Sequence, residues 1–321
     1  MDRVFVGIDV GSVSTNVVAL DVEGKIVSVQ YLRTNGQPIE AARCGLRNLN
    51  DEFNKEIEVL GMGTTGSGRQ LTGIMVGADV IKNEITAHAT ATITLVPETR
   101  TIFEIGGQDS KIIFLRDGMV TDFAMNTVCA AGTGSFLEHQ SERLGIPIED
   151  FGDLALTAQK NVRIAGRCTV FAESDMIAKQ QYGFSKAEII NGLCEALVRN
   201  YINNLGRGKK LEPPYVFQGG VAANKGIVAA FERELGHEVI VPPNFNVMGA
   251  VGAAILAREH IERTGKGTSF RGFECADLEF TPTSFICSGC DNSCEVIKVQ
   301  MAGRTMAMWG DRCGKWTNSV V

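Results

Sequence analysis

Short apolar runs near the start of the chain alternate with Gly, Ser and Asp, a pattern typical of strands joined by tight turns. The stretch "VFVGIDVGSVSTNVVALDVEGKIV" at residues 4–27 predicts three strands, with a turn after Asp9 and another at Glu23-Gly24. The stretch "TIFEIGGQDSKIIFLRDGMV" at residues 101–120 repeats this pattern. Helical periodicity follows each stretch. The chain therefore predicts two similar α/β domains, at about 1–96 and 97–268, each with a sheet covered by helices.

Helix signals are clear in the second half of the chain. Ser185 and Glu188 form a predicted capping box before a helical pattern that runs to Leu205. The stretch "VMGAVGAAILAREHIERTG" predicts a helix rich in small residues, which can pack closely against another backbone. After Gly265 the periodicity fades and Gly, Pro and Cys become frequent. We therefore expect a boundary near 268 and a small Cys-rich module at 269–321.

Composition narrows the classes of function. The 321 residues are 44% hydrophobic and 21% charged, with a net charge of −6, which gives no electrostatic basis for binding nucleic acid. The start "MDRVFVGIDVGS" lacks a signal-peptide pattern, and no apolar run reaches the roughly 20 residues of a membrane span. These features predict a cytoplasmic protein. The end at "WTNSVV" leaves open that the chain is a fragment of a longer protein.

Two Gly-rich turns predict phosphate binding. In "GIDVGSVST" the small residues let backbone N–H groups approach phosphate oxygens, and Asp9 is suited to hold Mg²⁺ through water. "EIGGQDSK" supplies a second turn with a second carboxylate, Asp109, so the two hairpins predict a clamp for a metal–triphosphate. "VFQGGVAANKG" adds a strand, a Gly-Gly turn and a helix for the base or ribose. Neither a P-loop nor a Rossmann fingerprint is present. The candidate nucleotide-binding residues are Gly11, Ser12, Ser14, Thr15, Gly106, Gly107, Gln108, Gly219, Gly220 and Asn224.

These elements, in this order, resemble the superfamily of sugar kinases, heat-shock chaperones and actin. The resemblance includes two connecting helices, "IKNEITAHA" at 81–89 and "NVMGAVGAAI" at 246–255. It implies two ribonuclease-H-like, actin-like ATPase domains with a nucleotide cleft between them. It also implies that Glu84 faces the cleft and orients the attacking water. The alternative for Glu84 is an ordinary solvated charge on a helix.

Cysteine usage adds a second kind of chemistry. Nine cysteines, an odd number without an export signal, favour metal or redox use over a disulfide framework. Cys44 and Cys194 lie in helical patterns and are predicted to be buried apolar residues. Cys129 and Cys168 each precede a predicted helix, whose N-terminal N–H groups favour a thiolate or an anionic iron–sulfur cluster. Each chain would supply two of the four thiolates that a [4Fe–4S] cluster takes, and a two-fold dimer would supply four.

The motifs "NTVCAAGTGSFLE" and "GRCTVFAESDMI" resemble those of the ATP-dependent activators of 2-hydroxyacyl-CoA dehydratases and the ATPase subunits of benzoyl-CoA reductase. This resemblance covers about residues 3–263. It implies an ATPase whose homodimer shares one [4Fe–4S] cluster through Cys129 and Cys168. It implies that Gly132, Thr133 and Gly134 contact nucleotide phosphates. It also implies a partner with its own iron–sulfur centre, namely a dehydratase, a benzoyl-CoA-type reductase or a double-cubane-cluster protein, and a ferredoxin or flavodoxin as electron donor.

Alternatives remain for the C-terminal cysteines and for the function of the chain. Cys287, Cys290, Cys294 and Cys313 in the last 35 residues have a spacing compatible with zinc or a second cluster, and equally with loose thiols. A sugar or acid kinase of the same superfamily would share the ATP motifs but has no use for two thiols at helix starts. A nucleotide-dependent interaction module with a zinc-binding tail is a third reading.

Overall fold

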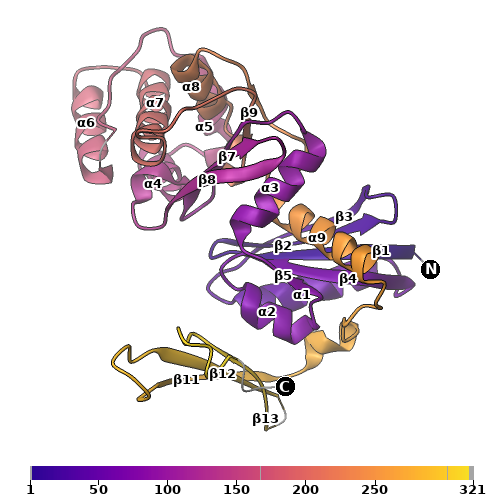
Figure 1. The fold of residues 1–321 in the computed structure, drawn as a ribbon. Coiled ribbons are helices and arrows are strands. Elements are labelled where there is room, and N and C mark those ends of the chain that lie inside the picture. The colour runs from indigo at the N-terminus through magenta and orange to yellow at the C-terminus, as the bar shows by residue number, and fades with distance from the viewer. Residues whose placement is uncertain (1, 167, 302, 318–321) are drawn as a thin grey trace. The chain divides into compact units, whose positions relative to one another are not determined.

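The computed structural model describes residues 2–166, 168–301 and 303–317 (Figure 1). Three β-sheets organise this part of the chain, two of five strands and one of three. The chain divides into two compact units, here called unit 1 (Met1–Asn83 and Ala253–Val321) and unit 2 (Glu84–Gly252). The α/β character predicted from the sequence is confirmed.

Unit 1 contains the first five-stranded sheet, in the order β3-β2-β1-β4-β5. Strand β1 pairs antiparallel with β2 and parallel with β4, so it lies at the centre of the sheet. Its apolar side chains are buried because β1 is covered on both faces, as central strands of α/β sheets are. The elements are β1 (Asp2–Val10), β2 (Ser14–Asp21), β3 (Ile26–Arg33), α1 (Pro38–Glu52), β4 (Ile57–Thr65), α2 (Arg69–Val76) and β5 (Val80–Ile81).

Unit 2 contains a second sheet in the order β10-β9-β6-β7-β8. Read from its other edge, β8-β7-β6-β9-β10, this sheet has the strand order of unit 1, with the same antiparallel and parallel pairs. The β7–β8 turn at Asp117-Gly118 has positive φ at both residues, as a tight hairpin turn requires. The internal repeat is thus a repeat of topology. The strands are β6 (Thr101–Ile105), β7 (Ser110–Arg116), β8 (Met119–Asn126), β9 (Tyr215–Gln218) and β10 (Val239–Ile240).

A helical insertion separates β8 from β9 in unit 2. Figure 1 shows its helices gathered beside the sheet of this unit. The predicted capping box is confirmed, since Ser185 and Glu188 bond each other's backbone N–H groups at the start of α7. The elements are η1 (Ala130–Gly132), α4 (Gly134–Leu144), α5 (Ile148–Leu156), α6 (Thr169–Gln181) and α7 (Lys186–Leu205), followed after β9 by η2 (Gly220–Ala223) and α8 (Lys225–Leu235).

The two predicted connecting helices are α3 (Glu84–Leu95) and α9 (Met248–Thr264). Close packing of the small residues of α9 is confirmed within each unit. A Cβ on Gly252 would lie 1.8 Å from the carbonyl oxygen of Ala87, and one on Gly63 would lie 2.1 Å from that of Ala253. The chain passes from unit 1 to unit 2 at Glu84 and returns to unit 1 inside α9, at Ala253. The predicted boundaries at 96/97 and 268/269 differ from these positions and stay a prediction.

The C-terminal segment begins as part of unit 1. Cys275, in η3 (Phe273–Asp277), is fully buried in the same core as β1 and α1. Thr268 donates a hydrogen bond of 2.7 Å to Asp79, and Arg47 bonds Asp277 at 2.7 Å. A three-stranded antiparallel sheet follows, formed by β11 (Phe280–Ile286), β12 (Glu295–Met301) and β13 (Arg304–Trp309). The residues that precede β11 therefore belong to the core of unit 1.

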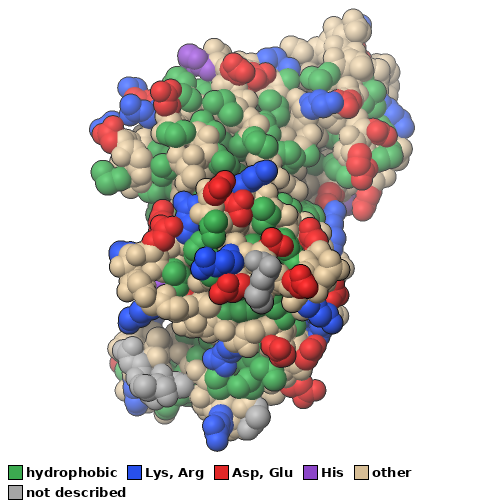
Figure 2. Space-filling view, turned by 90° about the vertical axis from the view of Figure 1, so that its right-hand side faces the viewer, with side chains coloured by type: hydrophobic (Ala, Val, Ile, Leu, Met, Phe, Trp, Pro, Cys, Tyr) green, Lys and Arg blue, Asp and Glu red, His purple; other side chains and the backbone are tan. Residues whose placement is uncertain are grey.

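Two further features concern membrane insertion and surface charge. Within the described residues, no helix combines the length and apolar character needed to cross a bilayer. On the face drawn in Figure 2, acidic and basic side chains are interspersed with apolar ones. That mixed surface agrees with the small negative net charge of the sequence.

Candidate phosphate loops and cysteine sites

The first predicted phosphate loop is a tight turn between β1 and β2. The N–H of Gly11 donates to the carbonyl oxygen of Ser14 at 2.9 Å, and a Cβ at Gly11 would lie 2.9 Å from that same oxygen. The turn therefore needs glycine. The hydroxyl of Thr15 is buried and lies 3.0 Å from that of Thr34. Thr15 thus organises the turn, and its contact with phosphate stays a prediction, as do those of Ser12 and Ser14.

The second predicted phosphate loop closes with the same hydrogen bond. The N–H of Gly106 donates to the carbonyl oxygen of Asp109 at 3.0 Å, as Gly11 does to Ser14. Aligned on this bond, Asp109 occupies the position of Ser14 rather than that of Asp9.

The residue that corresponds to Asp9 is Glu104. Asp9 lies opposite Asn16 in the β1–β2 ladder, and Glu104 lies opposite Lys111 in the β6–β7 ladder. The prediction that Asp9 and Asp109 are equivalent is therefore wrong, and Glu104 was not predicted. Counting residues back from the glycine of each turn would have found it.

Lys111 is a buried cation between two carboxylates of unit 2. Its Nζ lies 2.9 Å from Glu104 Oε2 and 2.9 Å from Asp109 Oδ2. Only 4% of Glu104 and 4% of Lys111 is exposed. Burial alone would lower the pKa of Lys111, but the nearby carboxylates outweigh burial and hold that pKa above its ordinary value, with Glu104 and Asp109 strongest and Glu84 next. Lys111 therefore stays charged.

Glu84 is the first residue of α3. Its carboxylate helps to raise the pKa of Lys111, as the carboxylate of Asp109 does, and all three residues belong to unit 2. Two of the predicted site carboxylates, Asp109 and Glu84, thus act on the pKa of one cation. The role of Glu84 in orienting water stays a prediction.

A buried polar network joins α3 to the Gly219-Gly220 turn in 216–226, which is predicted to bind the base or ribose and is here called the adenosine loop. His88 Nδ1 lies 3.1 Å from Gln218 Nε2, and Thr92 Oγ1 lies 3.1 Å from Gln218 Oε1. Burial, helped by the charge of Lys111, lowers the pKa of His88 to about 3, so the imidazole is neutral at physiological pH. Gln218 ends β9 and precedes the Gly219-Gly220 turn. The network therefore holds the start of that loop in place.

The adenosine loop itself needs glycine at its first position. Gly219 has φ +89°, and a Cβ there would lie 2.4 Å from the carbonyl oxygen of Ile105 and 2.6 Å from Glu104 Oε1. The loop thus packs directly against the end of β6. Asn224 caps α8 by accepting a hydrogen bond of 3.1 Å from the N–H of Ile227. Its predicted contact with nucleotide is untested.

The start of α4 is bonded to the second phosphate loop. The N–H of Gly134 donates to the carbonyl oxygen of Gly106 at 2.9 Å, and the N–H of Ser135 donates to that of Gly107 at 2.8 Å. Thr133 is the buried N-cap residue of α4, and its hydroxyl bonds the carbonyl oxygen of Ala130. The predicted phosphate residues 106–107 and 132–134 therefore form one connected backbone structure.

Cys129 immediately precedes the short turn η1, and α4 begins five residues later. Its N–H donates to Asn126 Oδ1 at 2.9 Å, while its carbonyl oxygen accepts from Asn126 Nδ2 at 2.7 Å. The side chain of Asn126 thus fixes both sides of this residue. The thiol is half-buried.

Cys168 is the N-cap residue of α6, as predicted. Its thiol is also half-buried. The segment before it is held by polar side chains: Asp175 accepts from the N–H of Ala165 at 2.9 Å, and Arg199 donates to the carbonyl oxygen of Ile164 at 2.8 Å.

Asn200 of α7 links the two cysteine segments. It is 3% exposed, and its Nδ2 donates to the carbonyl oxygen of Gly166 at 3.0 Å. A Cβ at Gly132 would lie 3.1 Å from its Oδ1 and 3.6 Å from Asn126 Nδ2. The chain before Cys168 and the chain after Cys129 therefore converge on one buried amide.

Large apolar side chains beside both cysteines are exposed. Val128, which precedes Cys129, is 94% exposed, and Val170 and Phe171, which follow Cys168, are 66% and 64% exposed. Tyr182 at the end of α6 is 74% exposed. Exposed apolar groups of this size are typical of surfaces that contact another molecule.

The other cysteines have different environments. Cys194 is buried as predicted, and burial raises the pKa of its thiol to about 12. The prediction for Cys44 is wrong: its side chain is exposed, because position 44 falls on the outer face of α1.

The four tail cysteines lie in the β11–β12 loop and in the segment after β13, at the same end of the antiparallel sheet. Trp316 Nε1–H and the N–H of Gly289 donate to Cys287 Sγ at 3.2 and 3.4 Å and lower the pKa of that thiol. Within residues 2–166, 168–301 and 303–317, however, no three Cys, His, Asp or Glu side chains are grouped to hold a metal ion. A second metal at Cys287, Cys290, Cys294 and Cys313 therefore has no assembled ligand set there.

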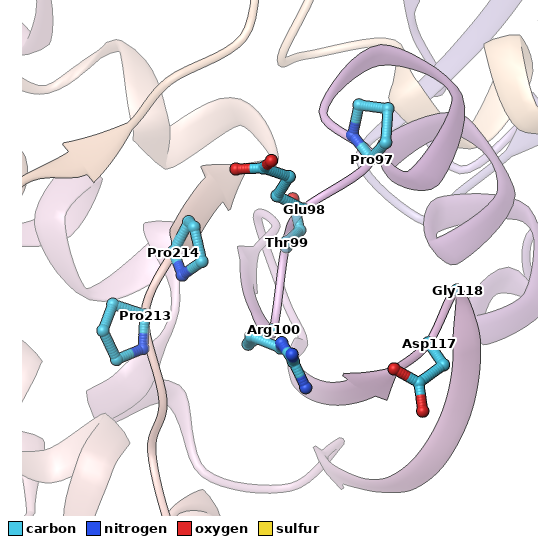
Figure 3. Close-up of a pocket in the computed structure, with 8 residues that line it drawn as sticks. All are labelled: Pro97, Glu98, Thr99, Arg100, Asp117, Gly118, Pro213 and Pro214. Atoms are coloured by element: carbon cyan, nitrogen blue, oxygen red, sulfur yellow. The ribbon is translucent and has the colours of Figure 1, made fainter.

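A pocket of about 390 Å³ lies elsewhere in unit 2 (Figure 3). It is lined by residues 97–100, 117–118 and 213–214, which come from three separate stretches of the chain. These stretches adjoin the beginning of β6, whereas the phosphate loop follows its end. None of the predicted site residues lines this pocket.

Comparisons with known proteins find several similar chains. The (R)-2-hydroxyglutaryl-CoA dehydratase activating ATPase of Acidaminococcus fermentans is 35% identical over 255 residues, covering 78% of this chain and 95% of that protein. The activator of lactoyl-CoA dehydratase of Anaerotignum propionicum is 36% identical over 266 residues, covering 80% and 98%. The structure of the activator of 2-hydroxyisocaproyl-CoA dehydratase from Clostridium difficile, with bound ADPNP, superposes with a TM-score of 0.73 at 30% identity, covering 82% of this chain and 97% of that one.

The model of the BadF/BadG/BcrA/BcrD ATPase family matches residues 6–257. That range contains both phosphate loops, the adenosine loop, Cys129 and Cys168, and ends before the C-terminal sheet. The chain therefore belongs to the BadF/BadG/BcrA/BcrD ATPase family.

Proposed function

We propose that this chain is an ATP-driven electron donor that activates a partner acyl-CoA dehydratase or reductase. Two relatives, 35% and 36% identical to it, are named as the activating ATPase of (R)-2-hydroxyglutaryl-CoA dehydratase and the activator of lactoyl-CoA dehydratase. A benzoyl-CoA reductase subunit of Thauera aromatica is 27% identical over 284 residues. The observation that carries the proposal is the pair of hydrogen bonds from Gly134 and Ser135 to the second phosphate loop, because they join nucleotide binding to the segment that holds Cys129.

The donor set of the two cysteine segments suits an iron–sulfur cluster. Cys168 is a half-buried residue at the N-cap of α6, where backbone N–H groups favour a thiolate. Cys129 is a half-buried residue directly before the three-residue turn η1. Thiolates are the usual ligands of iron in such clusters, and a [4Fe–4S] cluster takes four. A bound cluster would supply a one-electron carrier of low potential. Asn126 and Asn200 would keep the two cysteine segments in place.

A homodimer would complete the ligand set. Each chain contributes two thiols, and a two-fold axis repeats the same surface on both subunits. The exposed side chains of Val128, Val170 and Phe171 lie next to these thiols in sequence and would be covered in such a contact. This placement accounts for apolar side chains that would otherwise face water.

ATP would act by changing the conformation of the predicted phosphate loop at 106–107. Asp9 and Asp109 would bind Mg²⁺, and Glu84 would orient water towards the γ-phosphate. A change in the loop at 106–107 on hydrolysis would pass through two hydrogen bonds to the start of α4. ATP can drive this change only if it binds the two conformations with different affinity. Electrons would then pass from a ferredoxin or flavodoxin through the dimer to the iron–sulfur partner. A cytoplasmic location stays a prediction.

The decisive experiment is anaerobic purification of the full chain with iron, sulfide and ATPase assays. We expect a brown dimer with about four irons per dimer. Cys129→Ser and Cys168→Ser should lose the iron and keep ATP hydrolysis. Cys44→Ser changes an exposed thiol of unit 1 and should keep both. A colourless protein that takes up no iron on reconstitution would refute the electron-donor role. ATP consumption that depends on a sugar or acid and yields its phosphate ester would establish the kinase alternative instead.

A further inference from the structure

The two phosphate loops differ in one buried charge. Asn16, opposite Asp9 in unit 1, is neutral, whereas Lys111, opposite Glu104 in unit 2, is a cation. Both side chains are 4% exposed. A buried ammonium is costly to keep charged unless carboxylates compensate it, and Lys111 has two at 2.9 Å. The second loop is thus built around a cation that the first loop lacks.

The two carboxylates that bind Lys111 are not equivalent. Glu104 is as buried as Lys111 and lies on a rigid central strand, so it serves as a permanent counter-charge. The side chain of Asp109 is 37% exposed and belongs to the loop. Lys111 therefore links the solvent-accessible carboxylate of Asp109 to the buried carboxylate of Glu104 on β6.

This link lies close to the connection with α4. Asp109 closes the turn with Gly106, and the carbonyl oxygen of Gly106 accepts the N–H of Gly134. Releasing the side chain of Asp109 would remove one constraint on the loop that α4 is bonded to. Tyr201 adds a further constraint, since its hydroxyl donates to the carbonyl oxygen of Lys111 at the base of the loop.

We propose that Lys111 is the positioning residue of the second phosphate loop, which fixes the Asp109 carboxylate for a magnesium–nucleotide while Glu104 balances its charge. The inference rests on the proposed function in one respect, because it assumes that this loop binds a nucleotide. Lys111 acts through Asp109 and need not touch the nucleotide itself.

The test compares binding of a non-hydrolysable ATP analogue to the full chain by calorimetry, with Mg²⁺ and with EDTA. In the double variant Glu104→Gln/Lys111→Met both buried charges are removed together, so no uncompensated ion is left in the sheet. We expect magnesium-dependent binding to weaken on the order of tenfold, the value of one hydrogen bond to a charged group, and binding in EDTA to change less than about twofold. Lys209→Met, which removes an ion pair with Asp122 in the same unit, is the control and should change neither.

A double-mutant cycle separates positioning from a general loss of stability. Asp109→Asn should weaken magnesium-dependent binding as much as the double variant does, and combining the three changes should add little more. If the double variant does not fold, Glu104→Gln alone must keep binding within about twofold, since Lys111 still holds Asp109, while Asp109→Asn must lower it about tenfold. Wild-type binding in the double variant, or full additivity in the cycle, would overturn the role of Lys111. Absence of nucleotide binding in the wild-type chain would overturn the proposed function as well.

Discussion

The two five-stranded sheets have the same strand order and similar turns, yet they carry different chemistry. In unit 1 the passage from β3 to β4 contains one helix, α1. In unit 2 the corresponding passage from β8 to β9 contains η1 and the helices α4 to α7, with both Cys129 and Cys168. The shared topology supplies the two predicted phosphate loops, and the insertion in the second copy contains Cys129 and Cys168.

The two units also differ in the side chains beneath each turn. Unit 2 has a buried ion pair between Glu104 and Lys111 where unit 1 has Asp9 opposite Asn16. It also has the His88–Gln218 contact under the adenosine loop. The second copy is thus more polar inside, and its loop is bonded to α4. Under the proposed function, this copy would transmit the nucleotide state to the cysteines.

The largest effect should be a difference in stability between variants of Glu104 and of Asp9. Glu104→Ala leaves the buried Lys111 with a single, partly exposed carboxylate, so we expect the free energy of unfolding to fall by about 3–5 kcal/mol. Asp9 is half-buried and faces a neutral Asn16 across the ladder, and Asp9→Ala should cost less than half as much. Denaturant unfolding of both variants measures the difference. Equal losses would mean that the two loops do not differ in this way.

The next effect concerns pH and the buried His88. Its pKa of about 3 in the folded chain lies below the ordinary value of 6.5, so the unfolded chain takes up a proton that the folded chain does not as the pH falls below 6.5. The contribution of neutral His88 is therefore present above pH 6.5 and is lost towards pH 3. Between neutral pH and pH 5 we expect a loss of about 2 kcal/mol.

His88→Gln should flatten this part of the stability profile. His237→Gln, which changes an exposed imidazole of the same unit, should leave the profile as in the wild-type chain. Denaturant unfolding at several pH values between 5 and 8 provides the measurement. A His88→Gln profile parallel to that of the wild type would contradict the assignment of His88 as the titrating group.

A smaller effect should follow from cutting the link inside the insertion. Asn200→Ala removes the hydrogen bond to Gly166 and the side chain that packs against Gly132, so we expect a loss of about 1–2 kcal/mol. In iron-free protein, alkylation of Cys129 and Cys168 should become faster because both segments are released. Asn191→Ala, at a buried amide of α7 that is bonded to Arg233, should reduce stability without changing thiol reactivity. Unchanged alkylation in Asn200→Ala would exclude Asn200 as the link.

The sequence predicted strands, turns and the position of Cys168 at the start of a helix because these depend on local chemistry. Gly219 needs a positive φ, Ser185 caps its own helix, and Cys168 directly precedes α6. The match of Glu104 with Asp9 was not predicted, because Asp109 shares its residue type with Asp9, whereas Glu104 shares only its ladder position and its distance from the glycine of the turn. Cys44 shows the same limit, since a helical pattern gives the period but not which face is covered.

The smallest effect is expected for Asn16, which lies opposite Asp9 in unit 1. Asn16 has a buried Oδ1 that accepts no hydrogen bond within the described part of the chain. Replacing a group of this kind by an apolar one is nearly neutral, so Asn16→Leu should change the free energy of unfolding by less than about 1 kcal/mol. Lys111→Leu, at the matching position of unit 2, should cost several times more, because it leaves Glu104 buried without its cation. Measured side by side in denaturant, the two variants show whether the buried charge distinguishes the loops; a large loss in Asn16→Leu would show that unit 1 also depends on a polar group beneath its turn.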